Sequence, residues 1–190
     1  MTSFSRHVPP PVEPQAGVLV HSRADRELAV SQWLLLAALD THRARTEWSR
    51  TGTALLTCGA LFTVVRFSAA LVYAAFGTDD EQRIDGLLAG ALQGGPVFVD
   101  LHIQRYYALV PRSTAERKEW RGRARDTHAE CLEPGSYLGV PSPTQPSPSF
   151  GRSRWCVPMD GPGDLCSTEA VSQLMTYGRY RLAEAGEVIR

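Results

Sequence analysis

The chain has 190 residues, of which 43% are hydrophobic and 21% are charged, and this length predicts one domain with one core. Its 20 basic and 20 acidic residues balance, which removes the overall attraction to phosphates that is typical of nucleic-acid-binding proteins. No segment reaches the roughly 18 apolar residues of a membrane span, and the N-terminus lacks a signal-peptide core. We therefore expect a cytoplasmic protein without membrane contact.

The cysteine and lysine content bears on two further questions: the presence of a zinc or redox site, and the type of genome that encodes the chain. The four cysteines are widely spaced and form no CxxC pair, which favours buried free thiols over a zinc or redox site. Lys118 is the only lysine, and this arginine bias, together with abundant alanine and glycine, indicates a GC-rich genome such as that of an actinomycete.

The first predicted element follows a proline-rich tail over residues 1–18, which has too few apolar groups to order itself. A capping box at Ser22 predicts a helix that begins there and ends before Gly52. Within it, apolar residues including Leu28 and Leu39 recur on one face. We expect that face to pack against the core.

Two short apolar runs at residues 53–58 and 61–65 predict strands near a turn. Ser68 begins a helix that Gly77 ends, and a capping box over residues 78–81 begins the next helix. This pair superficially resembles a helix-turn-helix. The acidic N-terminus of the second helix would repel phosphates, so we do not favour DNA recognition there.

The second half of the chain is richer in strands. Residues 96–101 and 105–110 predict a β-hairpin, and a basic connector follows. The remaining predicted elements are strands at 129–132, 137–140 and 154–158, a Pro/Ser-rich loop at 141–150 and a helix at 167–182. This order predicts a single α+β domain over residues 22–186, with a largely antiparallel sheet flanked by helices.

The connector over residues 112–128 is the densest basic segment. It is interpreted either as an arm that contacts phosphates or as a solvated connector whose charges maintain solubility. Aromatic side chains on the hairpin could stack on single-stranded bases, and alternation predicts that only one of Tyr106 and Tyr107 is buried in a sheet covered on one side. The candidate nucleic-acid-binding residues are Arg105, Tyr107, Arg112, Arg117, Lys118, Trp120, Arg121, Arg123 and Arg125.

Three blocks between residues 53 and 158 resemble, in their order, the bacterial and plasmid primase-polymerase family. Residues 57–66 correspond to a strand that ends in Asp-x-Asp in the family, with Val64 and Arg66 roughly at the two aspartate positions. Arg105 stands near the position of a phosphate-contacting histidine. Glu130 corresponds to the third acid, and it is followed by a glycine turn and an apolar strand.

The resemblance implies a primase-polymerase-like fold in which two of three metal-binding acids are lost, so the two-metal site for phosphoryl transfer cannot be built at these positions. We therefore expect a non-catalytic accessory or regulatory activator protein for replication of an actinomycete plasmid or integrative element. Its expected partners are DNA or the replication proteins of the same element, and no cofactor is expected.

Two alternatives remain open. An active small primase or nucleotidyltransferase would use a rearranged magnesium site built from Asp100, His102 and Glu130, because the first two share one face of a strand. Asp and His are also common turn formers, so these two residues could simply form the hairpin tip. The second alternative is a protein–protein interaction module with no nucleic-acid role.

Overall fold

The computed structural model describes residues 22–121, 128–144 and 152–188. The predicted tail, most of the Pro/Ser-rich loop, and Arg123 and Arg125 lie outside these ranges. The elements are α1 (Arg23–Leu35), α2 (Thr41–Thr51), β1 (Thr53–Thr57), β2 (Phe62–Ser68), α3 (Ala69–Phe76), α4 (Glu81–Ala91), β3 (Val97–Asp100), β4 (Arg105–Pro111), the 3-10 helix η1 (Arg112–Glu116), β5 (Ala129–Cys131), β6 (Tyr137–Pro141), β7 (Ser153–Val157) and α5 (Thr168–Val188).

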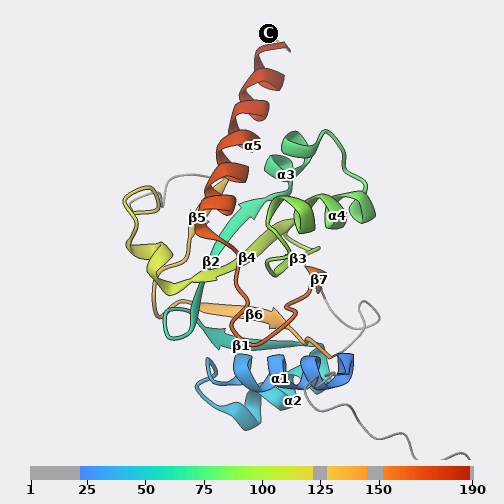
Figure 1. The fold of residues 1–190 in the computed structure, drawn as a ribbon, viewed down its shortest axis with the longest axis vertical. Coiled ribbons are helices and arrows are strands. Elements are labelled where there is room, and N and C mark those ends of the chain that lie inside the picture. The colour runs from blue at the N-terminus through green and yellow to red at the C-terminus, as the bar shows by residue number, and fades with distance from the viewer. Residues whose placement is uncertain (1–21, 122–127, 145–151, 189–190) are drawn as a thin grey trace, which may run out of the picture.

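The strands form two antiparallel sheets. Five strands lie in the order β5-β2-β4-β3-β7, and β1 pairs with β6 in a separate two-stranded sheet. Helices α3, α4 and α5 cover one face of the five-stranded sheet, whereas the β1-β6 sheet, α1 and α2 lie on the other side (Figure 1). The predicted α+β class with an antiparallel sheet flanked by helices is therefore confirmed.

Most predicted boundaries follow from local capping. Ser22 forms the expected capping box with Asp25, and Ser68 caps α3 by accepting from the Leu71 amide. The prediction for α4 was wrong in detail, because the N-cap is Asp80, whose carboxylate accepts from Arg83 N at 2.8 Å.

The prediction of a single long N-terminal helix was also wrong, because α1 ends at Leu35 and α2 begins at Thr41. Asp40 caps the second helix by accepting from Arg43 N. The carbonyl of Ala37 is used instead by the Thr57 amide of β1 at 2.8 Å. Leu39 lies in the break and is 78% exposed, so the predicted apolar face is interrupted there.

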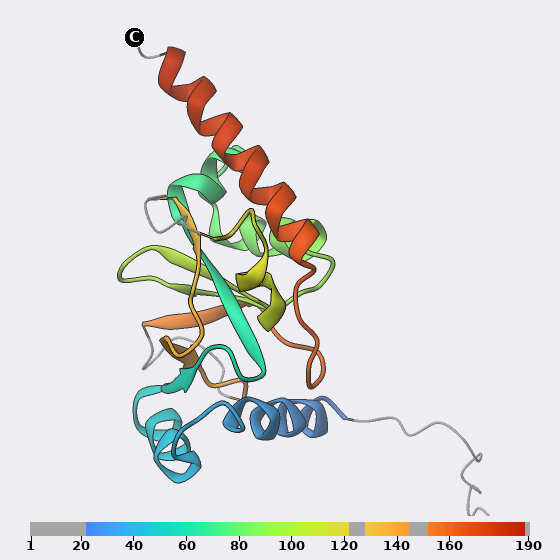
Figure 2. The same ribbon diagram turned by 90° about the vertical axis from the view of Figure 1, so that its left-hand side faces the viewer.

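Strands β1 and β2 follow one another but belong to different sheets. The turn between them contains Gly59 at φ 102°, and a Cβ at that position would lie 2.7 Å from Pro134 Cβ. Only glycine fits this close approach. The turn thereby redirects the chain from the small sheet into the large one, which Figure 2 shows from the side.

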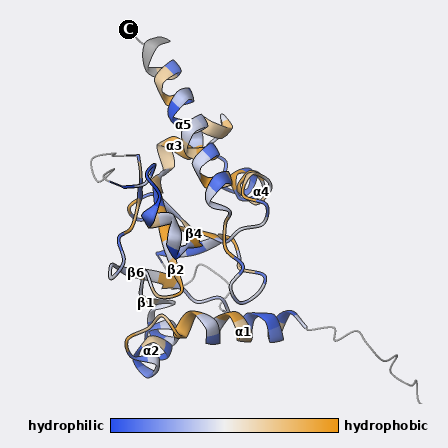
Figure 3. Cartoon of the chain, turned by 60° about the vertical axis from the view of Figure 1, so that its left-hand side comes forward, coloured by the Kyte–Doolittle hydropathy of each residue, from blue (hydrophilic) through white to orange (hydrophobic). Residues whose placement is uncertain are grey.

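Both faces of the five-stranded sheet are buried. We call the side covered by α3, α4 and α5 the helix-side core, and the side covered by β1, β6, α1 and α2 the pocket-side core. Figure 3 shows hydrophobic residues along β4 between these layers and hydrophilic residues over much of α2. Because the sheet is covered on both faces, Tyr106 and Tyr107 are both buried, and the prediction that only one is buried was wrong.

Candidate functional site

One row of side chains crosses the five-stranded sheet on its pocket side. The strand register places Glu130 opposite Arg66, Arg66 opposite Tyr107, and Tyr107 opposite Phe98. Directly opposed residues share a face of the sheet, so these four side chains lie next to one another. The row joins residues that are up to 64 positions apart in sequence.

The row contains an ion pair between Arg66 and Glu130, in which the guanidinium Nη2 donates to a carboxylate oxygen. Both side chains are partly buried, with exposures of 40% and 24%. Val64 lies two residues earlier on the same face and is fully buried. Thus Val64, Arg66 and Glu130 place an apolar side chain, a cation and a carboxylate near one another, and the cation neutralises the carboxylate.

The structure does not bring together Asp100, His102 and Glu130. The Asp100 carboxylate accepts from the backbone amides of His102 at 2.9 Å and Ile103 at 3.2 Å, as in a side-chain-capped turn. Glu130 is on β5, and the order β5-β2-β4-β3 separates it from β3 by three strand spacings, or about 14 Å. Within the described residues, no three His, Cys, Asp or Glu side chains form a group that could hold a metal ion.

The basic segment is divided between solvent and core. Arg112, Lys118 and Arg121 are exposed, whereas Arg117 pairs with Glu169 of α5 at 2.6 Å. Trp120 is 5% exposed and packs in the helix-side core. Because its ring is buried in this core, Trp120 presents no exposed face on which a base could stack.

Arg105 and Tyr107, the candidate nucleic-acid-binding residues on β4, do not form one surface with the basic segment. Arg105 begins β4 and Arg112 follows its last residue, so the strand separates them by roughly 20 Å. Tyr107 is 7% exposed and stacks on Phe98 with ring centroids 4.7 Å apart. Burial raises the pKa of its hydroxyl, and nearby Arg66 opposes that shift. Tyr107 is thus part of a packed wall and cannot stack on a base without rearrangement.

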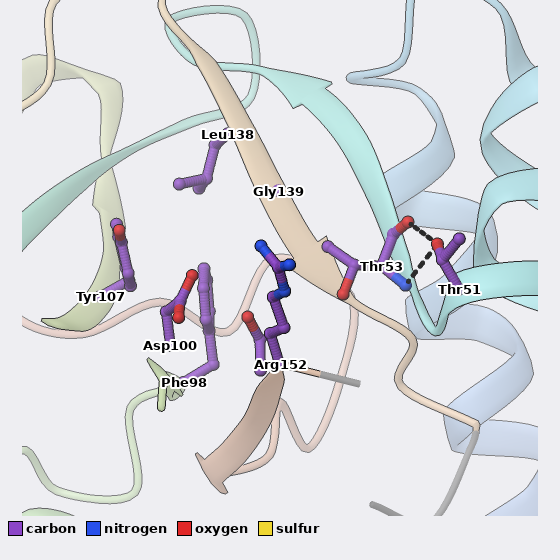
Figure 4. Close-up of a pocket in the computed structure, with 9 residues that line it drawn as sticks. Thr51, Thr53, Phe98, Asp100, Tyr107, Leu138, Gly139 and Arg152 are labelled. Carbon is purple, nitrogen blue, oxygen red and sulfur yellow. Dashed lines mark hydrogen bonds between the residues drawn. The ribbon is translucent and has the colours of Figure 1, made fainter. Parts of the chain in front are cut away.

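A pocket of about 290 Å³ opens between the two sheets. Figure 4 shows its apolar wall, made by Leu138, Phe98 and Tyr107, with Asp100 beside it and the Arg152 guanidinium extending toward Gly139. Arg152 is exposed and makes no ion pair with any described residue. The remaining lining residues are Thr51, Thr53 and Ser153.

Sequence reasoning did not find Arg152 or Gly139 as site residues. Arg152 precedes a strand directly and carries no motif, and Gly139 was noted only as part of an apolar strand. They meet because β6 of the small sheet lies near β3 and β7 of the large one, an arrangement that no local pattern encodes.

The four cysteines are free, as predicted. Burial raises the pKa of Cys58 and of Cys131 to about 11, and that of Cys166 to about 12, so none of these thiols is activated as a nucleophile. Along the described chain, no helix has the length and apolar character needed to cross a bilayer.

No protein-family model, curated protein or solved structure matches this chain. The fold and the pocket define an α+β protein with two antiparallel sheets and a pocket of mixed polar and apolar lining between them.

Proposed function

We propose that this chain is a non-catalytic accessory or regulatory protein for replication of an actinomycete plasmid or integrative element, built on a degenerate primase-polymerase-like domain. The observation that carries the proposal is the Arg66–Glu130 ion pair, because it places a guanidinium against the one remaining acid. A divalent cation at Glu130 would have to displace Arg66 and would then be held by a single carboxylate.

The proposed contact with DNA uses the exposed part of the basic segment. Arg112, Lys118 and Arg121 are all exposed and lie within ten residues of one another along the chain. Since the formal net charge of the chain is zero, the attraction to DNA is local and is expected to weaken steeply with salt. Cytoplasmic location and partnership with the element's own replication proteins belong to the same proposal.

Nucleotide incorporation on a single-stranded template, with Mg²⁺ or Mn²⁺, tests the non-catalytic part. We expect no incorporation by the wild-type chain. Incorporation that Glu130→Gln abolishes would overturn the proposal and establish an enzyme. The matched control is Glu133→Gln, because Glu133 is an exposed acid in the turn that follows β5.

A fluorescence-polarisation titration of the same template across salt tests the DNA-binding part. Lys118→Gln is expected to reduce the slope of log K against log salt by about 0.7, the value for one lost phosphate contact on a single strand. The control is Arg83→Gln on the exposed surface of α4, which should leave the slope unchanged. The DNA role is wrong if the template does not bind. It is also wrong if binding does not weaken with salt and Lys118→Gln leaves it unchanged.

A further inference from the structure

The hydrogen bonds at the two ends of the β1-β6 sheet show which residue pairs along it are hydrogen-bonded. The Cys58 amide donates to Ser136 O and the Ser142 amide donates to Gly52 O, each at 2.9 Å, at opposite ends of the β1-β6 ladder. Since hydrogen-bonded pairs alternate in an antiparallel ladder, Ala54–Val140 and Leu56–Leu138 are also hydrogen-bonded pairs. The backbone groups of the intervening pairs, Leu55–Gly139 and Thr57–Tyr137, therefore point away from the ladder.

The outer edge of β1 is closed by the rest of the protein. The Leu55 amide donates to the Glu47 carboxylate at 3.0 Å, and the Thr57 amide donates to Ala37 O at 2.8 Å. The Leu55 amide, and then Arg43, lower the pKa of Glu47, so this acceptor is ionised at neutral pH. Such capping prevents another strand from adding to β1.

The outer edge of β6 differs. In the part of the chain that the structure describes, only the end of this edge is closed, where Trp155 Nε1 donates to Pro141 O at 3.2 Å. The outward N–H and C=O groups of Tyr137 and Gly139 have no hydrogen-bond partner among the described residues. Gly139 lines the inter-sheet pocket and Tyr137 is 58% exposed, and no strand of the described residues covers this short edge.

We propose that the open edge of β6 and the inter-sheet pocket bind a short extended peptide that carries a carboxylate. The peptide backbone adds to Tyr137 and Gly139 as a further antiparallel or parallel strand, in the manner of β-augmentation. Its carboxylate pairs with Arg152, which lies beside Gly139 and makes no ion pair with any described residue.

The chemistry of the pocket favours a peptide over a nucleic-acid strand. Two residues with outward N–H and C=O groups offer donors and acceptors in alternation, which is the pattern that a peptide backbone satisfies. A phosphate backbone has only acceptors and would leave both carbonyls unpaired. Asp100 in the pocket wall is an acceptor that a peptide N–H can satisfy, whereas a phosphate backbone has no donor to offer it. None of the basic residues proposed to contact DNA takes part, so this inference can hold or fail independently of the proposed function.

Selection from a library of random heptapeptides with free carboxyl termini, displayed on phage, tests the proposal on the full chain. Parallel selections use wild-type protein and Arg152→Glu, with Arg83→Glu as the matched control for an exposed arginine. We expect enrichment on wild-type and on Arg83→Glu, and none on Arg152→Glu. The enriched peptide is then synthesised with a fluorescent label, and its Kd is measured by polarisation.

Two further variants test the backbone contact. Gly139→Pro removes the outward N–H without removing a ladder bond, and it should weaken binding by about tenfold or more. Gly139→Ala keeps the N–H and places a Cβ in the same position, 3.1 Å from Thr53 Cγ2, so it controls for crowding. It should change Kd by less than about threefold. Amide hydrogen exchange in the complex should slow at Gly139 and Tyr137.

Comparing the free-acid peptide with its C-terminal amide identifies the source of the carboxylate. A large loss with the amide assigns it to the peptide terminus, and no loss assigns it to an Asp or Glu side chain of the peptide. The proposal is overturned if wild-type and Arg152→Glu enrich equally, if nothing is enriched, or if the Gly139 amide exchanges at its free rate in the complex. Protection of Gly139 by single-stranded DNA in place of peptide would also overturn it.

Discussion

The two faces of the five-stranded sheet carry different kinds of side chain. On the helix side, Phe67, Val99 and Tyr106 face α3, α4 and α5, and the central part of the interface is apolar. On the pocket side, Val64 gives way along β2 to Arg66, and Phe98 gives way along β3 to Asp100.

This difference separates stability from binding. The helix side buries its apolar surface against three helices, so its residues contribute mainly to the free energy of folding. The pocket side has its own apolar core against β1, β6, α1 and α2, and it also holds the partly exposed ion pair and the pocket between the two sheets. We therefore expect core substitutions on the helix side to act on stability and substitutions at the edge of the pocket to act on binding.

The largest effect is expected for Phe67→Ala, which removes a fully buried ring from the helix-side core. The free energy of unfolding should fall by about 3–5 kcal/mol, the usual cost of the lost burial plus the cavity. Arg152→Ala at the pocket should change it by less than about 0.5 kcal/mol, since that residue is exposed. Urea denaturation of both variants measures the contrast, and equal losses would contradict the separation of the two faces.

The contact between α3 and α5 comes next. A Cβ at Gly178 would lie 2.5 Å from Leu71 Cδ2 and 3.0 Å from its carbonyl oxygen, and a backbone atom cannot yield cheaply. Gly178→Val should therefore cost about 1–3 kcal/mol by overpacking. Gly90→Ala on α4 meets nothing within 4 Å and should instead stabilise the helix by up to about 1 kcal/mol. Thermal midpoints that move in the same direction would disprove this account.

A smaller effect is expected where β7 meets α4. Arg154 pairs with Asp85 at 2.6 Å and with Glu81 at 3.2 Å, and its side chain is 14% exposed. Arg154→Met would leave the Asp85 carboxylate half-buried without its cation, so we expect a loss of about 1–2 kcal/mol, less than for a fully buried pair. Arg23→Met breaks a pair on exposed α1 and should cost less than about 0.5 kcal/mol.

The smallest effect concerns two of the four thiols, one taken from each core. The pKa of Cys58 on the pocket side and of Cys131 on the helix side both rise from 9.0 to about 11, so alkylation by iodoacetamide at pH 8 should be about 100-fold slower than for a free thiol. A faster reaction at Cys58 alone would show that the pocket-side core opens more readily.

The same shifts set a pH dependence. The folded state holds these protons more tightly than the unfolded state does, so their contribution to stability is complete below pH 9 and is lost as the pH rises toward 11. The thermal midpoint should consequently fall between these pH values. Replacing both thiols by alanine should make the fall shallower, and an unchanged fall would assign it to other groups.

Local patterns predicted much of the fold because they describe interactions between near neighbours. The capping box at Ser22, the cap at Ser68 and the αL glycine at Gly77 were predicted and are present, as is the hairpin of β3 and β4. The break between α1 and α2 was not predicted, since it depends on Thr57 of β1 recruiting the carbonyl of Ala37.

The sequence did not predict which of the candidate site residues are exposed to solvent. Trp120 sits in a basic segment yet is buried, and Arg117 is bound to α5. Aromatic and arginine residues in such a run have the same local pattern whether they face solvent or the core. Only packing between segments distant in sequence separates the two cases.

The sequence by itself determined the α+β class and most strands and helices, because these depend on residue type and short-range order. The tertiary structure alone decided that β1 and β2 enter different sheets, that Arg66 pairs with Glu130, and that Arg152 meets the open edge of β6. Each of these depends on strands brought together from distant parts of the chain, and their pairing is selected by burial of both faces of the central sheet, a property of the whole domain.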